Sequence, residues 1–276
     1  MERNFMLAAI DLGITNIDIV FHQGDTYGHV RLPANGQPVE RQMEAALNAL
    51  QAQGCQPAKI AVTGGQYRRL ATRFDAVEIV GVSEVQAIGL GGLALAGVER
   101  ALVVSAGSGT AMVAARGRDC THITGIAVGG GTLQGLGRLL VGTADAPEID
   151  RLALAGDPNR ADLTLVEAVG GTVGRLPPDA NAVNFGRLAR QPLELSQPDL
   201  AAALVRLVGQ VIAVVAINAA RAEGLEPIVV IGHLVDLPSL RRVLNEVAGY
   251  YQATIYVPER PGMGTALGAL LWAEGL

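Results

Sequence analysis

The chain has 276 residues, enough for one large domain or two lobes, and its net charge of −5 argues against a nucleic-acid-binding domain, which would be basic. Its two cysteines have no CxxC spacing and its four histidines have no ligand-like spacing, so neither a disulfide nor a zinc site is predicted. No signal-peptide pattern is present, because Asp11 interrupts the short apolar stretch near the N-terminus, and we expect a cytoplasmic protein.

The first part of the chain begins with three strand-like runs separated by short, turn-rich breaks, which predict an antiparallel meander. Helical and strand-like patterns then alternate, so the predicted order is βββαβαβα. This is the order of a ribonuclease-H-like fold, a mixed sheet with helices on its faces. The predicted strands are 6–10, 17–22, 27–32, 59–63 and 77–80, and the predicted helices are 39–53, 67–72 and 84–95.

The second part repeats this order, starting again with a strand, a glycine turn and two more strands. We therefore expect an α/β protein of two ribonuclease-H-like lobes, residues 1–97 and 98–276, with a nucleotide cleft between them. Residues 157–198 are rich in Pro and Asn and are expected to be an insertion with short helices. The predicted strands are 101–105, 110–115, 120–126, 228–231 and 254–257, and the predicted helices are 132–140, 148–155, 200–223, 237–246 and 264–273.

The helix predicted at 200–223 is the most apolar long segment. Polar residues such as Arg206 and Asn218 interrupt it, which favours a buried core helix over a membrane span. Alanines at helical spacing would let another helix approach closely, so this helix is expected in the core or at a two-fold interface.

Two apolar strands run into loops that resemble phosphate-binding turns. Residues 7–15 read LAAIDLGIT and residues 101–112 read ALVVSAGSGTAM. Glycines bring backbone N–H groups close to an anion, hydroxyls add donors, and a carboxylate such as Asp11 suits Mg²⁺. We expect a nucleotide bound between the loops, although a plain hairpin turn is the alternative for either one. The second loop contributes Gly107, Ser108, Gly109 and Thr110.

One stretch makes the expectation more specific: residues 124–137, TGIAVGGGTLQGLG, resemble the GGGTxxGLG signature of type II pantothenate kinases. These kinases belong to the actin, hexokinase and sugar-kinase-like superfamily. The resemblance covers nearly the whole chain, and it implies an ATP-dependent kinase that phosphorylates pantothenate in coenzyme A biosynthesis and forms a homodimer. Further matches are LALAGDPNRAD at 152–162, NAVNFGR at 181–187, IVVIG at 228–232 and GMGTALGALL at 262–271.

The resemblance also implies roles for individual residues. Gly129, Gly130 and Gly131 would close on the nucleotide phosphates at the start of a helix, whose free N–H groups favour anions; a tight lobe-packing turn is the alternative. Gly232 would follow the strand before the base contact. Gly13 and Thr15 would act with Asp11, and the implied ligands are ATP, Mg²⁺, pantothenate or a similar alcohol, and a coenzyme A thioester.

Several positions depart from the family pattern. The family's first loop reads roughly DxGGTLxK, but residues 11–18 read DLGITNID, so the family's Lys falls on Asp18. The family's Glu, the base on the substrate hydroxyl, falls on Val82, and its Arg before the glycine block falls on His122. The cationic and basic groups of the family's site are therefore changed together.

Residues at or near these changed positions are the candidates for the roles of base, anion contact and metal ligand. Glu84 is the only carboxylate in residues 81–97 and is the predicted base, or else a charge at a helix N-terminus. His122 is predicted as an anion contact, or else as a strand-surface residue, and Asp18 as a second metal residue. Three hypotheses stay open: a type II pantothenate kinase with a rearranged site, a kinase of another small alcohol, and a non-catalytic relative that binds nucleotide or coenzyme A.

Overall fold

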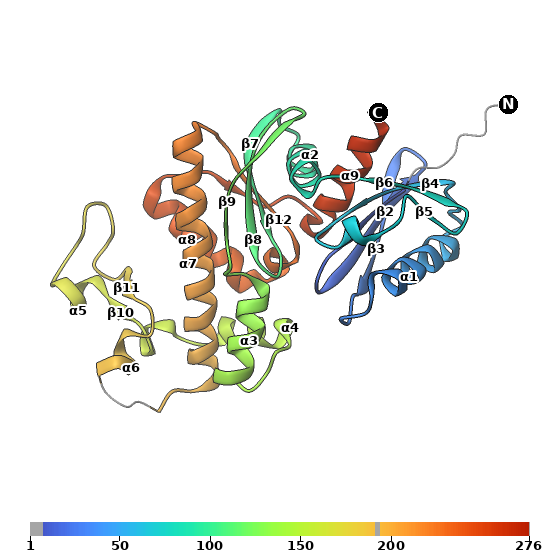
Figure 1. The fold of residues 1–276 in the computed structure, drawn as a ribbon. Coiled ribbons are helices and arrows are strands. Elements are labelled where there is room, and N and C mark those ends of the chain that lie inside the picture. The colour runs from blue at the N-terminus through green and yellow to red at the C-terminus, as the bar shows by residue number, and fades with distance from the viewer. Residues whose placement is uncertain (1–7, 191–193, 276) are drawn as a thin grey trace.

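The computed structural model describes residues 8–190 and 194–275, which form two lobes built on separate sheets (Figure 1). The six-stranded sheet of the first lobe has the order β3-β2-β1-β4-β6-β5. Its elements are β1 (Ala8–Leu12), β2 (Asn16–Gln23), β3 (Thr26–Pro33), α1 (Val39–Ala52), β4 (Lys59–Thr63), η1 (Tyr67–Arg69), β5 (Arg73–Phe74), β6 (Val77–Gly81) and α2 (Glu84–Ala96).

The second lobe contains a five-stranded sheet of order β13-β12-β7-β8-β9. Its strands are β7 (Arg100–Ala106), β8 (Thr110–Arg116), β9 (Asp119–Ile126), β12 (Ile228–Ile231) and β13 (Ile255–Tyr256). Its principal helices are α3 (Gly130–Leu140), α4 (Ala146–Ala155), α7 (Gln197–Glu223), η3 (His233–Asp236), α8 (Pro238–Tyr251), η4 (Pro261–Met263) and α9 (Gly264–Glu274).

The two sheets share one topology. In the first lobe the central strand β1 pairs antiparallel with β2 and parallel with β4. In the second lobe β7 pairs antiparallel with β8 and parallel with β12. The meander and the parallel strands therefore recur in the same order, which confirms the predicted duplication of a ribonuclease-H-like lobe.

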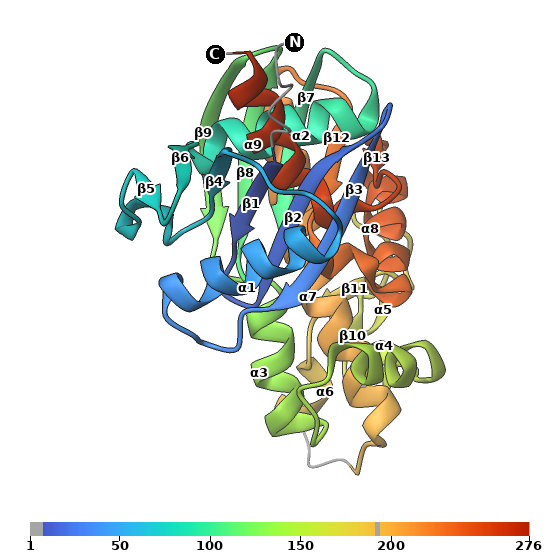
Figure 2. The same ribbon diagram turned by 90° about the vertical axis from the view of Figure 1, so that its right-hand side faces the viewer.

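Helices cover both faces of each sheet. Figure 2 shows α1 crossing the outer face of the first sheet, where its apolar residues join one core cluster. The helices α2 and α9 lie side by side between the sheets (Figure 1). Their backbones touch, since a Cβ on Gly91 or Gly268 would lie 1.8 Å from a carbonyl oxygen of the other helix. The helix α9 covers the first sheet and α2 covers the second, so each lobe is completed by a helix from the other part of the chain.

The segment predicted as an insertion contains short helices and also a two-stranded sheet that the sequence did not suggest. Its elements within the described residues are η2 (Pro158–Arg160), β10 (Leu163–Thr164), α5 (Leu165–Val169), β11 (Asn181–Val183) and α6 (Gly186–Arg190). The two strands are only two and three residues long, and the proline and asparagine content of the segment predicts loops. The sequence pattern therefore gave no strand signal there.

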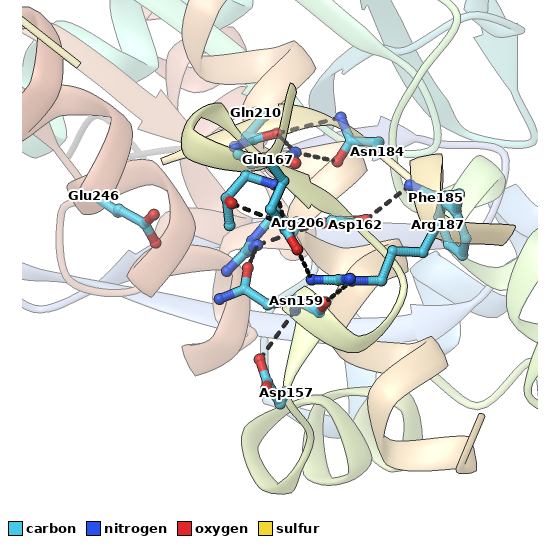
Figure 3. A network of polar contacts seen from close by, with 12 residues as sticks. Asp157, Asn159, Asp162, Glu167, Asn184, Phe185, Arg187, Arg206, Gln210 and Glu246 are labelled. Carbon is cyan, nitrogen blue, oxygen red and sulfur yellow. Dashed lines mark hydrogen bonds and ion pairs between the residues drawn. The ribbon is translucent and has the colours of Figure 1, made fainter. Parts of the chain in front are cut away.

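A polar network fastens the insertion to α7 (Figure 3). Arg206 of α7 donates from Nη1 to Asn159 Oδ1 at 2.6 Å, and it lies 3.4 Å from Asp162 Oδ2. The Phe185 N–H donates to the other oxygen of Asp162 at 2.8 Å. Burial raises the pKa of Asp162 to about 6, although the Phe185 and Arg206 contacts oppose the shift. The network therefore positions the insertion on the second lobe.

The long helix α7 is a core element. Among the described residues it is the single helix long and apolar enough to cross a membrane, and 61% of its most apolar stretch is buried inside the protein. Its apolar residues join the main core cluster of the second lobe. The expectation of a buried core helix is therefore confirmed.

Candidate active site

A cavity of about 560 Å³ lies between the lobes, within the range usual for small-ligand sites. The loop after β1, the β7–β8 loop, the start of α3 and the segment after β12 meet around it. Gly129 and Gly131 are outside this lining. The predicted site residues that line it are Asp11, Gly13, Thr15, Glu84, Gly107, Ser108, Gly109, Thr110, His122, Gly130 and Gly232.

Three polar residues of the first sheet lie on its inner face because side chains alternate along a strand. Asp11 of β1 is the register partner of Asp18 on β2 and of Thr63 on β4. The residues on either side of them, such as Ile10 and Leu12, face α1 and belong to the core under it. The inner face therefore carries two carboxylates and a hydroxyl at the end nearest the cavity.

Asp11 is held in an unfavourable environment for a negative charge. Burial raises its pKa to about 8, the charges of Asp18 and Glu84 add to the shift, and His233 opposes it. A cation beside Asp11 would offset this cost, because an opposite charge favours the ionised carboxylate.

The surroundings of Asp11 fit a magnesium ion. Mg²⁺ is usually held by one or two carboxylates, with water and substrate phosphates completing its shell. The hydroxyl of the neighbouring Thr63 is fully buried and has no hydrogen-bond partner among the described residues. The described residues contain no group of three metal-ligating side chains, so a metal here would depend on the nucleotide for further ligands.

Asp18, predicted from the sequence as a second metal residue, is hydrogen-bonded to two histidines in the structure. His29 Nε2 lies 2.7 Å from its Oδ1, and His233 Nε2 lies 3.0 and 2.9 Å from its two oxygens. Burial alone would raise the pKa of Asp18, but the hydrogen bonds from His233 and His29 outweigh burial and lower it. Its carboxylate is therefore occupied by two rings, and through His233 it links the first lobe to the second.

The two loops predicted to bind phosphate face each other. The Thr15 and Ser108 hydroxyl oxygens are 2.8 Å apart, which joins the loops across the cleft. The Thr110 hydroxyl donates to the Val128 carbonyl at 2.8 Å, so it supports the neighbouring turn. The Thr15–Ser108 contact therefore joins the two lobes directly at the cavity.

The glycine block 129–131 differs from expectation in one respect. The N–H groups of Gly130 and Gly131 donate to the carbonyls of Gly107 and Ser108 at 2.8 and 2.9 Å. The sequence suggested that these N–H groups are free to bind an anion, but in the structure both are paired with backbone carbonyls. A Cβ on Gly129 would lie 2.8 Å from the Ser108 carbonyl oxygen, so glycine lets the two backbones touch. The block holds the β7–β8 loop in place at the cavity.

Part of the cavity lining from the second lobe is apolar. Gly232 follows β12 and is succeeded by η3, whose Leu234 lines the cavity with Leu237, Leu133 and Ala146. Such a wall suits the flat, largely apolar ring of a nucleotide base.

Glu84 and Val82 have different environments. Glu84 is the first residue of α2, it lines the cavity, and burial raises the pKa of its carboxyl. Val82 is fully buried in the cluster between α9 and the first sheet and does not line the cavity. The position at which the family carries its base is therefore a core residue in this chain and not part of the cavity wall. His122 is exposed on β9 and lines the cavity from the second lobe.

Sequence reasoning missed several cavity residues. Gly65 was seen only as part of the turn after a strand, although a Thr-Gly-Gly run after a buried strand is a usable signal. Arg31 and His233 gave no local signal, because their relevance depends on partners far along the chain.

Solved structures with the same fold include nucleotide-binding proteins. The activator of the 2-hydroxyisocaproyl-CoA dehydratase from Clostridium difficile, with bound ADPNP, superimposes with a TM-score of 0.67 at 15% identity, covering 97% of this chain and 94% of that one. A ROK family glucokinase from Streptomyces griseus, in complex with glucose and AMPPNP, gives 0.59 at 15% identity, covering 98% and 100%. At this identity the likeness concerns the fold.

Relatives by sequence point to one family. A type II pantothenate kinase of Staphylococcus haemolyticus is 30% identical over 175 residues, which cover 63% of this chain. The match spans 66% of the relative, just under two thirds of its length. One from Bacillus cereus is 27% identical over 228 residues, covering 78% and 81%. The Fumble family model matches residues 100–271, more than half of the chain. The chain therefore belongs to the Fumble family.

Proposed function

We propose that the protein is an ATP-dependent kinase that phosphorylates the hydroxyl group of pantothenate. The observation that carries this proposal is the convergence of Asp11, Glu84 and the β7–β8 loop on one cavity between two lobes. The family's relatives are named type II pantothenate kinases, which supports the choice of acceptor.

Positioning and charge stabilisation dominate catalysis of phosphoryl transfer, and the cavity supplies groups for both. The loop Gly107–Thr110 would hold the nucleotide phosphates, and the apolar wall beside Gly232 would take the base. Asp11 would hold Mg²⁺, which neutralises phosphate charge when bound. The first loop, with Gly13 and Thr15, would close on the phosphates from the other side.

Glu84 is the proposed base. The acceptor hydroxyl oxygen forms a bond to the γ-phosphorus as the bond to ADP breaks, and the hydroxyl proton passes to the Glu84 carboxylate. A carboxyl whose pKa is raised by burial is a better proton acceptor near neutral pH than an exposed one. His122, which lines the cavity from β9, is the proposed anion contact.

We further propose that the boundary between the lobes lies between residues 97 and 98, and that residues 157–198 are an insertion in the second lobe. We also propose that the protein is a cytoplasmic homodimer and that it binds a coenzyme A thioester. Support for these points comes from the sequence pattern and the family resemblance. Light scattering should give about twice the chain mass of 28.6 kDa. A single chain mass at micromolar concentration would overturn the homodimer.

A coupled assay of ADP release across pantothenate, pantetheine and other small alcohols tests the function. We expect pantothenate turnover, and Glu84→Gln should lower kcat about a hundredfold or more with unchanged ATP affinity, because general base catalysis contributes that much. Turnover of another alcohol alone would indicate a kinase of different specificity. Nucleotide binding without any turnover would indicate a non-catalytic relative. Unchanged activity in Glu84→Gln would remove Glu84 as the base while leaving the kinase assignment intact.

A further inference from the structure

The cavity has an unusual balance of charges for a site that receives a nucleotide. Three carboxylates line it, those of Asp11, Asp18 and Glu84. Among the described residues of its lining, Arg31 is the only arginine or lysine. A polyphosphate entering this cavity needs a positive group, and the family's lysine position on β2 holds Asp18 instead.

Strand pairing places Arg31 next to that position. Asp18 and Arg31 are direct register partners on β2 and β3, so their side chains share the inner face of the sheet. A long side chain at position 31 can therefore place its charge in the same part of the cavity as a cationic side chain at position 18 would.

Hydrogen bonds connect Arg31 to the point where the two loops meet. Its Nε donates to Asn16 Oδ1 at 3.0 Å, and Asn16 follows Thr15, whose hydroxyl contacts Ser108 across the cleft at 2.8 Å. The guanidinium thus lies beside the first loop, and both Arg31 and Asn16 line the cavity.

The charge of Arg31 is available for a ligand. Its side chain is 48% exposed, and its one ion-pair contact among the described residues, to Asp236, is at the long distance of 4.0 Å. Asp18 beside it is instead occupied by His29 and His233. The negative group on β2 is therefore paired with the histidines and does not neutralise the arginine.

We propose that Arg31 binds the phosphate groups of the bound nucleotide and supplies the positive charge that position 18 lacks. The inference rests on the proposed ATP-dependent function of the same cavity. A guanidinium presents several N–H donors in a plane that matches phosphate oxygens, which an acidic residue at position 18 cannot do.

Calorimetry with ATP, ADP and AMP, each with Mg²⁺, tests the proposal on the full chain. Arg31→Ala should weaken ATP binding about tenfold to a hundredfold, the usual loss for a hydrogen-bonded charge, and should weaken AMP binding much less. Arg31→Lys should retain part of the ATP affinity because it keeps the charge. Arg41→Ala is the matched control, since Arg41 is an exposed arginine of the same lobe that pairs with Glu44 on α1.

The outcomes separate this proposal from the function on which it rests. Wild-type protein that binds no ATP at millimolar concentration would overturn both. Wild-type binding that persists unchanged in Arg31→Ala would overturn the role of Arg31 alone. An equal loss for ATP and AMP, or a raised KM for pantothenate with unchanged ATP affinity, would likewise show that Arg31 does not bind the polyphosphate. Thermal melting of each variant distinguishes these losses from unfolding.

Discussion

At the cleft, β1 of the first lobe and β7 of the second end at equivalent places with different neighbours. Asp11 lies one residue before the end of β1 and is paired with Asp18 and Thr63. Ser105 lies one residue before the end of β7 and is paired with Ala111 and Ile231. The same pairing pattern therefore carries two carboxylates and a hydroxyl in one lobe, and a single hydroxyl with two apolar residues in the other.

Under the proposed function, this difference gives the two similar lobes different parts in one site. A polyphosphate is repelled by carboxylates unless cations intervene, so the uncharged β7–β8 loop suits direct contact with phosphate. The charged end of the first sheet suits a metal ion, and the negative charge of Asp18 there is paired with His29 and His233. Topology alone would assign both loops the same role.

The largest expected effect comes from removing the charge that distinguishes the lobes. Asp11→Asn should lower kcat by several powers of ten, on the order of 10³-fold, because a bound metal ion contributes several kcal/mol of charge stabilisation. Ser105→Ala, at the equivalent position of the second lobe, should change kcat by less than about tenfold. Steady-state rates at saturating ATP and varied Mg²⁺ measure both. Equal losses in the two variants would contradict the division between the lobes.

The second prediction concerns the contact that holds the β7–β8 loop of the second lobe. Gly129→Ala places a Cβ 2.8–2.9 Å from backbone atoms of residues 107–109, so it should destabilise the protein by about 1–3 kcal/mol and weaken ATP binding. Gly135→Ala lies in the same helix α3 with open space around its Cβ, and it should stabilise slightly. Denaturant unfolding and calorimetry test the pair. Normal ATP affinity in Gly129→Ala would show that the loop tolerates displacement.

Local patterns predicted most of the fold and part of the site. Alternating apolar residues and glycine turns are local signals, so the strands at Ala8–Leu12 and Arg100–Ala106 could be placed before the structure was known. The pairing of Asp18 with His233 could not be predicted, because 215 residues separate them and only lobe packing joins them. The free N–H groups expected at Gly130 and Gly131 were wrong for the same reason, since their acceptors lie on another loop.

The contact between Asp18 and His233 predicts a pH-dependent stability. Burial alone would lower the pKa of His233, but hydrogen bonds to Asp18 and Asp236 raise it to about 9, above the usual 6.5. Its contribution is therefore present in full below about pH 6.5 and is lost as the pH rises through about 9. At acid pH the contribution of this contact also depends on Asp18, whose pKa lies below its usual 3.8. Protonation of the Asp18 carboxylate below that pH removes the negative partner of His233.

His233→Gln should cost about 1–2 kcal/mol of unfolding free energy at pH 6, and the difference from wild type should vanish above pH 9. Melting curves between pH 5 and 10 measure it. His122→Gln is the control, because His122 is exposed and has no carboxylate partner among the described residues. A constant difference for His233→Gln across this range would contradict a charged pair.

The smallest expected effect tests whether the first lobe keeps its buried hydroxyl for a ligand. The Thr63 Oγ1 is buried and finds no hydrogen-bond partner in the described part of the chain, which costs stability. Thr63→Val should therefore leave the free protein as stable as wild type or up to about 1 kcal/mol more stable. If the hydroxyl supports a metal-bound water beside Asp11, the same variant should raise the Mg²⁺ concentration needed for half-maximal activity several-fold, while Thr63→Ser should not. Equal Mg²⁺ dependence in all three proteins would mean that this hydroxyl has no part in the site, and that the carboxylates alone distinguish the first lobe from the second.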